Sequence, residues 1–410
     1  MDSRLIPDEG WLVRNADANR MYAIQAGVKW QSYQEEALTE IALQGPPQRL
    51  LLYYRTGGGK TLTALACLRR CGYQTALVIA PPSTHAQWHA EAARLSVQVE
   101  VVSHAKFRMR DFKLKRDQPI IADEFHMFGG NTAVGFKKLD RAAANLTAPI
   151  ILCSATPNYN DAERCYCVQH ILDPASCVGG YLHFLSVHCK TRLNPFSATP
   201  YVDGFIHFAS AADYLASLKQ TVYVPETHVA TIEDIEYPVD LPEAFDKFNF
   251  DERTGRIMTS IIQRRWSRQF YGLLTKDEEL VDIVQERLIE IAGNATGPLV
   301  IFAVSKRVIA ALDEMLKKAN VTYCRVTGDE TTSQKSQMIA DFRTGHFDVL
   351  IGTAALATGT DGLDKVCDTL VILQDTDDDA LRRQLIGRIM PRGTDTDASN
   401  KQVFRFVPVE

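Results

Sequence analysis

The stretch Arg49–Thr61 constrains this chain most, because it joins an apolar run to a glycine-rich turn and then to a helical pattern that continues to Arg70. A strand, a glycine loop, a lysine, a hydroxyl and a helix, in this order, form the context of a phosphate-binding loop. Glycines let backbone N–H groups turn towards phosphate oxygens, and the N-terminal end of the following helix adds a favourable dipole. The sequence therefore predicts a nucleotide-phosphate site formed by Thr56, Gly57, Gly58, Gly59, Lys60 and Thr61.

Lys60 and Thr61 have separate expected roles at this loop. Lys60 would reach the β- and γ-phosphates of ATP, and Thr61 would place its hydroxyl on Mg²⁺. The strict Walker A pattern has a further glycine five residues before Gly59, where this chain has Tyr54. A glycine-rich turn without a ligand is therefore the alternative for the loop taken alone.

Two carboxylates, Asp123 and Glu124, end a second apolar run that begins at Pro119. The carboxyl ends of parallel strands are where nucleotides bind in open α/β sheets. We expect Asp123 to hold Mg²⁺, directly or through water, and Glu124 to orient and deprotonate the attacking water. An acidic strand end that caps the next helix is the alternative, but the glycine loop several strand–helix units upstream favours a nucleotide site.

The composition excludes some classes of protein. The chain has 410 residues, enough for two or three domains, and 45 Lys+Arg against 50 Asp+Glu make it mildly acidic. This balance argues against a broadly basic nucleic-acid coat but leaves room for a local basic groove. We expect no secretion signal, because the N-terminal residues 1–10 lack an apolar core, and no membrane span, because no apolar run reaches about 18 residues. Nine scattered cysteines fit a reducing cytosol better than a disulfide framework.

Cysteines and histidines cluster in one part of the chain. The cluster consists of Cys165, Cys167, His170, Cys177, His183, His188 and Cys189. Its spacing matches no common zinc pattern, and a helix through Cys165 and Cys167 would point the two thiols in different directions. We therefore interpret these cysteines as structural, with zinc as the alternative.

Apolar strands alternate with helical patterns in two blocks, from about Trp30 to Asp173 and from about Gly297 to Glu410. The strands expected in the first block are Arg49–Tyr54, Thr75–Pro81, Val99–His104, Pro119–Asp123 and Pro149–Ser154. Those expected in the second are Leu299–Val304, Thr322–Val326, Phe347–Thr353, Thr369–Gln374 and Val403–Val407, with helices such as Lys306–Lys318 and Thr332–Arg343 between them. Near-continuous apolar strands indicate parallel sheets buried on both faces, so each block is expected to be a doubly wound α/β sheet.

The stretch 176–296 has a different pattern, with aromatic residues, histidines and prolines followed by two helical patterns. These helices are expected near Ile257–Leu274 and Lys276–Ala292. We interpret this stretch as a mostly helical connecting region and not as an independent enzyme.

The order of motifs in both blocks resembles a helicase superfamily two motor, and within it most closely the Swi/Snf-type double-stranded DNA translocases. The motifs that carry this resemblance are Trp30-Gln-Ser-Tyr-Gln34, the glycine loop, Val78-Ile-Ala-Pro-Pro-Ser83-Thr-His-Ala-Gln87-Trp88, Val102-Ser103-His104, Asp123-Glu124, Ser154-Ala-Thr156-Pro157, His170-Ile-Leu-Asp173-Pro174, Val300-Ile-Phe302, Val326-Thr-Gly328-Asp329, and the blocks around Gly359 and Gln384. The resemblance covers roughly residues 30–410. It implies two tandem RecA-like lobes, at 30–175 and 297–410, with an N-terminal extension at 1–29 and the connecting region at 176–296.

The resemblance also implies an activity and the residues that perform it. The chain is expected to couple ATP hydrolysis, with Mg²⁺, between its lobes to movement along DNA, most simply duplex DNA. Lys60, Glu124, Arg388 and Arg392 would be catalytic, and Gln34, Gly359, Asp361 and Gln384 would bind the nucleotide beside the glycine loop. The nucleic-acid contacts would be Ser83, Ser103, Lys106, Ser305, Thr327 and Thr353. Ser154 and Thr156 would couple hydrolysis to movement.

The chain departs from the family pattern at two places. Phe125 stands where the family usually has Ala or Gly, and Pro391 stands where its second arginine normally falls, so that Arg392 comes one residue late. Arg388 is therefore the better candidate for an arginine finger. The large insertions of chromatin-remodelling members are short or missing, so chromatin remodelling does not follow from the resemblance.

Several alternatives remain open at the level of sequence. Gln34 could cap a helix, and Ser154 and Thr156 could stabilise loops. The basic stretches Lys106–Arg116 and Arg264–Arg268 could line a backbone groove or be solvated faces. An RNA-directed ATPase of the same superfamily and a nucleotide-binding scaffold without turnover are the other functions. A bacterial or phage-infected host cytosol is the expected location, and the sequence identifies no protein partner.

Overall fold

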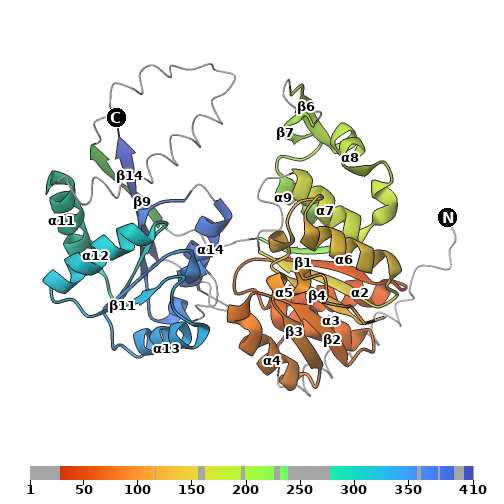
Figure 1. Cartoon of the computed structure of the whole chain (residues 1–410), viewed down its shortest axis with the longest axis horizontal. Coiled ribbons are helices and arrows are strands. Elements are labelled where there is room, and N and C mark those ends of the chain that lie inside the picture. Colours follow the sequence, from red (N-terminus) through yellow and green to blue (C-terminus); the bar gives the residue numbers. More distant parts are fainter. Residues whose placement is uncertain are drawn as a thin grey trace. The chain divides into compact units, whose positions relative to one another are not determined.

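The structure, a computed structural model, describes residues 28–115, 117–155, 162–194, 199–225, 231–238, 278–357, 362–376, 379–391 and 401–409. The chain divides into two compact units between Glu226 and Thr227. Each unit is built on one six-stranded sheet whose paired strands are all parallel (Figure 1). The predicted α/β class with two doubly wound parallel sheets is confirmed.

The sheet of the first unit has the order β3-β2-β4-β5-β1-β8. Its strands are β1 (Arg49–Tyr54), β2 (Thr75–Ile79), β3 (Gln98–Val102), β4 (Ile120–Asp123), β5 (Ile150–Ser154) and β8 (Thr221–Val224). The five strands predicted for this block are present, with ends that differ by at most a few residues. The sequence did not predict β8, which pairs with β1 at the edge of the sheet.

Helices cover both faces of this sheet. They are α2 (Ser32–Leu43), α3 (Lys60–Arg70), α4 (His85–Arg94), α5 (His104–Arg108), α6 (Val134–Asn145), α7 (Ala162–Leu172), α8 (Gly180–His188) and α9 (Ala211–Ala216). Alternate residues of β1 face opposite ways, as the two-residue period of a strand requires. Leu50 and Leu52 share a buried cluster with α2, α3 and α4, whereas Leu51 and Tyr53 share one with α5 to α9.

The segment after β5 is part of this unit. Cys165 and Cys167 lie in α7 and are fully buried, so the helical placement of the two thiols is confirmed. Beyond α8, a small antiparallel pair is formed by β6 (Cys189–Arg192) and β7 (Tyr201–Phe205). In the part of the chain that the structure describes, no group of three or more His, Cys, Asp or Glu side chains is arranged to hold a metal ion.

The sheet of the second unit has the order β11-β12-β10-β13-β14-β9. Its strands are β9 (Thr231–Pro238), β10 (Leu299–Ala303), β11 (Tyr323–Val326), β12 (Val349–Gly352), β13 (Thr369–Gln374) and β14 (Gln402–Val409). Its helices are α11 (Glu278–Asn294), α12 (Lys306–Lys318), α13 (Thr332–Arg343) and α14 (Asp379–Ile389). The predicted bounds of α12 and α13 are confirmed to the residue. Leu299 and Ile301 face α11 and α12, and Val300 and Phe302 face α13 and α14.

The stretch 176–296 is shared between the two units. Its described elements α8, α9 and β8 belong to the first unit, and β9 and α11 belong to the second. The unpredicted β9 pairs along the whole length of β14. The helix expected near Lys276–Ala292 is present as α11, whereas Ile257–Leu274 lies outside the described residues. No helix in the described ranges is long and apolar enough to cross a membrane.

Candidate nucleotide site and nucleic-acid surface

The carboxyl edge of the first sheet gathers most of the residues that the sequence predicts for this unit. Along the strand order they are Ser103 after β3, Ser83 after β2, Asp123 and Glu124 at the end of β4, Ser154 at the end of β5, and the glycine loop after β1. Parallel strands place all their carboxyl ends at one edge, so segments far apart in the sequence meet there. The predicted phosphate site and the predicted acids are therefore brought to one edge.

The glycine loop has a backbone that other residues would not adopt. Gly57 and Gly59 have φ angles of 75° and 78°, in the left-handed region, and Gly59 directly precedes α3. A Cβ on Gly59 would lie 2.6 Å from Nε2 of Gln34, and one on Gly58 would lie 3.0 Å from Cβ of Tyr54. The loop therefore requires glycine both for its conformation and for its close neighbours.

Lys60 is the first residue of α3, and its side chain turns back over the loop. Its Nζ donates to the carbonyl oxygens of Tyr54, at 3.2 Å, and of Arg55, at 3.3 Å. These two carbonyl oxygens hold the half-buried ammonium of Lys60 beside the turned backbone of the loop. Thr61, the next residue, is also half-buried. This arrangement can accept a phosphate group if Lys60 exchanges a carbonyl for a phosphate oxygen.

Gln34 is buried and joins α2 to the glycine loop. Its Oε1 accepts from the backbone N–H of Gln31 at 3.0 Å, and its Nε2 donates to Thr63 Oγ1 at 3.1 Å. Thr63 in turn donates to the carbonyl oxygen of Gly59 at 3.0 Å. Gln34 thus caps α2, as the alternative interpretation of this residue proposed, and it also stabilises the loop. Its role in reading adenine stays a prediction.

Asp123 is buried, and both of its carboxylate oxygens accept hydrogen bonds. Trp88 Nε1 donates to Oδ2 and the backbone N–H of Glu124 donates to Oδ1, both at 3.0 Å. Burial, and then the neighbouring Glu124 carboxylate, raise the pKa of Asp123 to about 7. The sequence motif included Trp88 without giving it a role. A fully buried indole needs a hydrogen-bond acceptor for its N–H. This requirement is the property from which a contact between Trp88 and a buried acid could have been expected.

Glu124 lies at a strained turn beside His126. Its φ of 46° is in the left-handed region, which is uncommon for a residue other than glycine. Its Oε2 is buried and accepts no hydrogen bond within the described ranges, although His126 Nδ1 lies 3.4 Å away. His126 Nδ1 is also 3.1 Å from Ser154 Oγ. His126, which the sequence reasoning did not select, therefore lies between the candidate base and the candidate coupling residue.

Phe125, which departs from the family pattern, belongs to the buried core of the first unit. Its ring is buried and stacks on Phe128, with 5.6 Å between the ring centroids. Both residues belong to η3 (Phe125–Phe128), the turn that follows β4. The apolar core therefore accommodates the larger residue.

His104 is a second residue that the sequence reasoning did not select. It begins α5, is buried, and has Nε2 2.9 Å from the carbonyl oxygen of Asp123. Burial lowers the pKa of His104 to about 4, so the ring is neutral near pH 7. A carbonyl oxygen only accepts, and therefore the Nε2 atom carries the proton and donates it.

In the second unit, Thr327, Thr353 and Ser305 follow the adjacent strands β11, β12 and β10 at one carboxyl edge. Ser305 caps α12, because its Oγ accepts from the backbone N–H of Arg307 at 3.2 Å. Thr353 and Thr327 are buried. The structure thus brings the three predicted nucleic-acid contacts of this unit to neighbouring strand ends.

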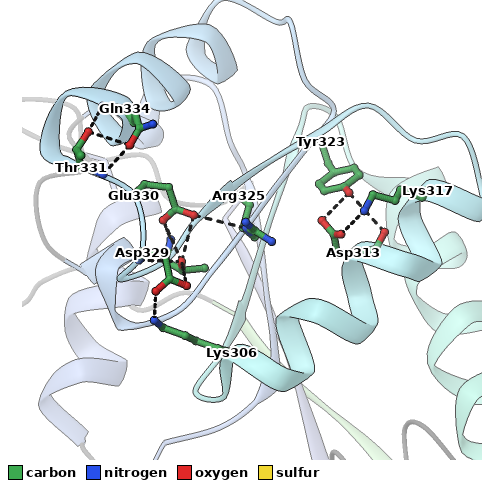
Figure 2. A network of polar contacts seen from close by, with 10 residues as sticks. Lys306, Asp313, Lys317, Tyr323, Arg325, Asp329, Glu330, Thr331 and Gln334 are labelled. Atoms are coloured by element: carbon green, nitrogen blue, oxygen red, sulfur yellow. Dashed lines mark hydrogen bonds and ion pairs between the residues drawn. The ribbon is translucent and has the colours of Figure 1, made fainter.

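Acidic side chains bind the polar groups at this edge (Figure 2). Glu330 Oε2 accepts from the backbone N–H of Thr327 at 2.6 Å and from its hydroxyl at 2.9 Å. Arg325 Nε lies 3.5 Å from Glu330 Oε1, and Lys306 pairs with Asp329. A phosphate group would have to replace these carboxylates to reach Thr327 or Lys306.

Two further predicted residues of this unit, Gln384 and Arg388, lie in α14. Arg388 Nε donates to the carbonyl oxygen of Ala357 at 3.0 Å, and Gln384 is buried. Ala357 ends η6 (Ala354–Ala357), the turn after β12. The other predicted residues, Thr156, Gly359, Asp361 and Arg392, lie outside the described residues.

The known proteins to which this chain is similar include helicases and an ATPase core. Residues 277–393 match the family model of the helicase conserved C-terminal domain. Saccharomyces cerevisiae Dbp5 bound to RNA and ADP–BeF3 is a similar solved structure, with a TM-score of 0.53 and 19% identity over 97% of this chain and 87% of that chain. A variant of Dbp5 with the same ligands has a TM-score of 0.53 and 18% identity, over 100% of this chain and 89% of that chain. The Sulfolobus solfataricus SWI2/SNF2 ATPase core in complex with dsDNA has a TM-score of 0.40 and 14% identity, over 93% of this chain and 88% of that chain.

Proposed function

We propose that this chain is a helicase superfamily two motor, driven by ATP, that moves along nucleic acid with duplex DNA as its track. The match of residues 277–393 to the helicase C-terminal domain and the two parallel-sheet units support this proposal. ATP and Mg²⁺ would be its cofactors. The observation that carries the proposal is the carboxyl edge of the first sheet, where a glycine loop with a lysine lies at the same edge as a buried aspartate and a glutamate with an unbonded oxygen.

The residues at this edge suit a nucleotide. The turned glycine backbone and Lys60 offer donors to phosphate oxygens, and a Cβ at Gly59 would collide with the Gln34 side chain that stabilises the loop. Thr61 and Asp123 offer the hydroxyl and carboxylate oxygens that Mg²⁺ prefers, and both could act through water. When bound, Mg²⁺ would offset the negative charge of the phosphate oxygens. Glu124 would take the proton of the attacking water.

We assign the second unit a role in both turnover and grip. Arg388 would neutralise charge on the transferring phosphoryl group, as an arginine finger does. Ser305, Thr327 and Thr353, with Ser83, Ser103 and Lys106 of the first unit, would hold the nucleic-acid backbone without reading sequence. Ser154 would report the state of the nucleotide site through His126. The assignments to Arg392, Gly359, Asp361, Gln384 and Thr156 also stay proposals.

The choice of duplex DNA rests on the sequence motifs. The Pro81-Pro82-Ser83 and Asn160-Asp161 patterns resemble those of the duplex translocases and not those of RNA-directed members. RNA is the alternative polymer, and the Dbp5 structures that share the fold contain RNA. We also propose that the protein works in a reducing cytosol, in a bacterium or a phage-infected host.

ATP turnover with different polymers tests the proposal. Turnover would be measured without polymer and with single-stranded DNA, duplex DNA or RNA, using Glu124→Gln as the blank. We expect the strongest stimulation with duplex DNA and none in the variant. Stimulation by RNA alone would overturn the DNA assignment, and turnover no higher than that of Glu124→Gln with every polymer would overturn the motor.

A further inference from the structure

The segment Lys106–Lys115, termed here the basic segment, leaves the carboxyl end of β3 and takes no part in the nucleotide chemistry described above. Its exposed cations are Lys106, Arg108, Arg110, Lys113 and Lys115. Lys115 pairs with Glu100 at 3.3 Å, and no salt bridge within the described part of the chain holds the other four. The only acid within the segment is Asp111. The basic segment therefore presents a strip of positive charge on a chain that is acidic as a whole.

Buried contacts hold the backbone of the basic segment in place. The Phe107 ring is fully buried between Phe112 and Phe128, with centroid distances of 5.9 Å and 5.7 Å. Lys138 of α6 donates to the carbonyl oxygens of Met109 and Phe112, both at 2.7 Å. The cations thus project from an anchored stretch, and less conformational entropy is lost when they bind a ligand than in a free loop.

Two contacts connect the basic segment to the candidate catalytic carboxylates. His104, two residues before the segment, donates to the carbonyl oxygen of Asp123. Phe107, inside the segment, packs on Phe128, which ends the η3 turn that begins directly after Glu124. A displacement of the basic segment would therefore act on the backbone on both sides of the Asp123–Glu124 pair.

We propose that the basic segment binds the phosphate backbone of nucleic acid and that His104 transmits this binding to Asp123 and Glu124. The inference rests on the proposed function and adds to it a surface and a positioning residue. The recognised group is the repeating phosphate, which cations on an anchored strip contact without regard to base sequence. His104 acts through the Asp123 backbone and touches no reacting atom.

The binding half is tested by a charge-matched pair of triple variants. One carries Arg110→Gln, Lys113→Gln and Lys115→Gln, and the control carries Arg141→Gln, Lys190→Gln and Lys219→Gln, which also remove exposed cations of this unit. Binding of labelled single-stranded DNA, duplex DNA and RNA would be followed by anisotropy over a range of salt, without ATP. For the basic-segment triple with duplex DNA, we expect the slope of log affinity against log salt to fall by about two to three relative to the control. Equal slopes would overturn the proposal.

The transmission half is tested by two variants at His104. His104→Leu removes the donor, and His104→Gln keeps a donor near the position of Nε2. We expect His104→Leu to keep its polymer affinity while the ratio of polymer-stimulated to polymer-free turnover falls by about tenfold, and His104→Gln to restore most of that ratio. An unchanged ratio in folded His104→Leu would overturn transmission. Wild-type protein that binds polymer without stimulation would instead overturn the proposed motor.

Discussion

The β1–α3 and β10–α12 junctions have the same design, yet only the first has a loop long enough to surround the phosphates of a nucleotide. Each leads from a buried parallel strand into a helix whose first residue is a lysine, Lys60 or Lys306. In the first unit the connection Arg55–Gly59 contains two left-handed glycines, whereas in the second it is only Val304 and Ser305. A long glycine connection can turn its N–H groups around an anion, and a short one closed by a serine cap cannot.

The partners of the two lysines differ in the same way. Lys60 Nζ is held by carbonyl oxygens, which keep it beside the loop and leave its full charge available. Lys306 Nζ is paired with the Asp329 carboxylate, which offsets its charge. We therefore expect the same fold to supply a nucleotide site at one edge and a weaker anion surface at the other, according to the side chains at each edge.

The amino edges of the two sheets, in contrast, are closed alike. Arg49, at the start of β1, is buried and donates to the carbonyl oxygens of Ala143 at 2.9 Å and Ala148 at 3.2 Å. Lys401, just before β14, is buried and donates to those of Asp364 at 2.8 Å and Cys367 at 3.1 Å. A buried cation with several carbonyl partners stabilises loops, so these two cations are structural.

The largest expected difference is between Lys60→Met and Lys306→Met. Methionine keeps most of the side-chain length and removes the charge. Loss of one preorganised donor to a transition-state oxygen costs about 10²–10³ in turnover, which is the effect we expect for Lys60→Met. Lys306→Met should change turnover at saturating polymer by less than about threefold, because its charge is already offset. Steady-state ATP hydrolysis measures both, and equal losses would abolish the distinction between the two junctions.

The glycine loop can be tested with two left-handed glycines in different surroundings. Gly59→Ala adds a Cβ 2.6 Å from Gln34 Nε2, whereas Gly72→Ala, at φ 86°, meets nothing within 4 Å. Both variants should lose about 1–2 kcal/mol of unfolding free energy from backbone strain. Only Gly59→Ala should also weaken binding of a fluorescent ATP analogue, by about tenfold. Denaturant unfolding and nucleotide titration separate the two effects, and normal nucleotide binding by Gly59→Ala would count against the phosphate loop.

The sequence was sufficient for most of the fold because the central strands of both sheets are buried on both faces. Long apolar runs such as Arg49–Tyr54 and Thr369–Gln374 have no competing interpretation, and their bounds are those observed. The strands β8 and β9 were missed because an edge strand needs fewer apolar residues, and β9 carries Glu233 and Asp234. The place of each strand in its sheet depends on pairing with a strand far away in the chain, and the local sequence pattern does not reveal that partner.

The sequence predicted which strand ends form the candidate site, but it did not predict the side-chain contacts within that site. Strand order puts Asp123, Ser154 and the glycine loop at one edge, as parallel pairing requires. The contacts of Trp88, His104 and His126 with this edge depend on where buried side chains find partners after folding. Burial also raises the pKa of Asp123. The spacing of residues in the sequence does not indicate how completely that carboxyl is removed from solvent.

The pH dependence of stability distinguishes the carboxylate of the first edge from ordinary surface acids. Because the pKa of Asp123 is raised to about 7 in the folded protein, that carboxyl contributes stability below its ordinary pKa of about 3.9 and loses it as the pH rises through 7. Asn at this position does not titrate. The melting temperature of Asp123→Asn minus that of wild type should therefore be higher at pH 8 than at pH 5, by roughly a few degrees. Thermal melts with EDTA check this, and a constant difference would contradict the burial of the charge.

The smallest effect is expected at the edge of the second unit, for Asp329→Asn. This change leaves Lys306 without its carboxylate partner (Figure 2). It also removes a negative charge next to Thr327. Because the pair is exposed and screened by salt, the melting temperature should stay unchanged and polymer affinity should rise by only about threefold at low salt.

A matched variant, Glu314→Gln, removes the same charge from an exposed position on α12, where Glu314 lies 3.8 Å from Lys317. Polymer affinity measured at two salt concentrations separates the two variants, since a general electrostatic effect would raise both equally. A rise confined to Asp329→Asn would identify the ends of β10 and β11 as a surface where nucleic-acid phosphate replaces an internal carboxylate. If both variants change equally, the carboxyl edge of the second unit does not grip the polymer, and the predicted contacts at Ser305 and Thr327 are wrong.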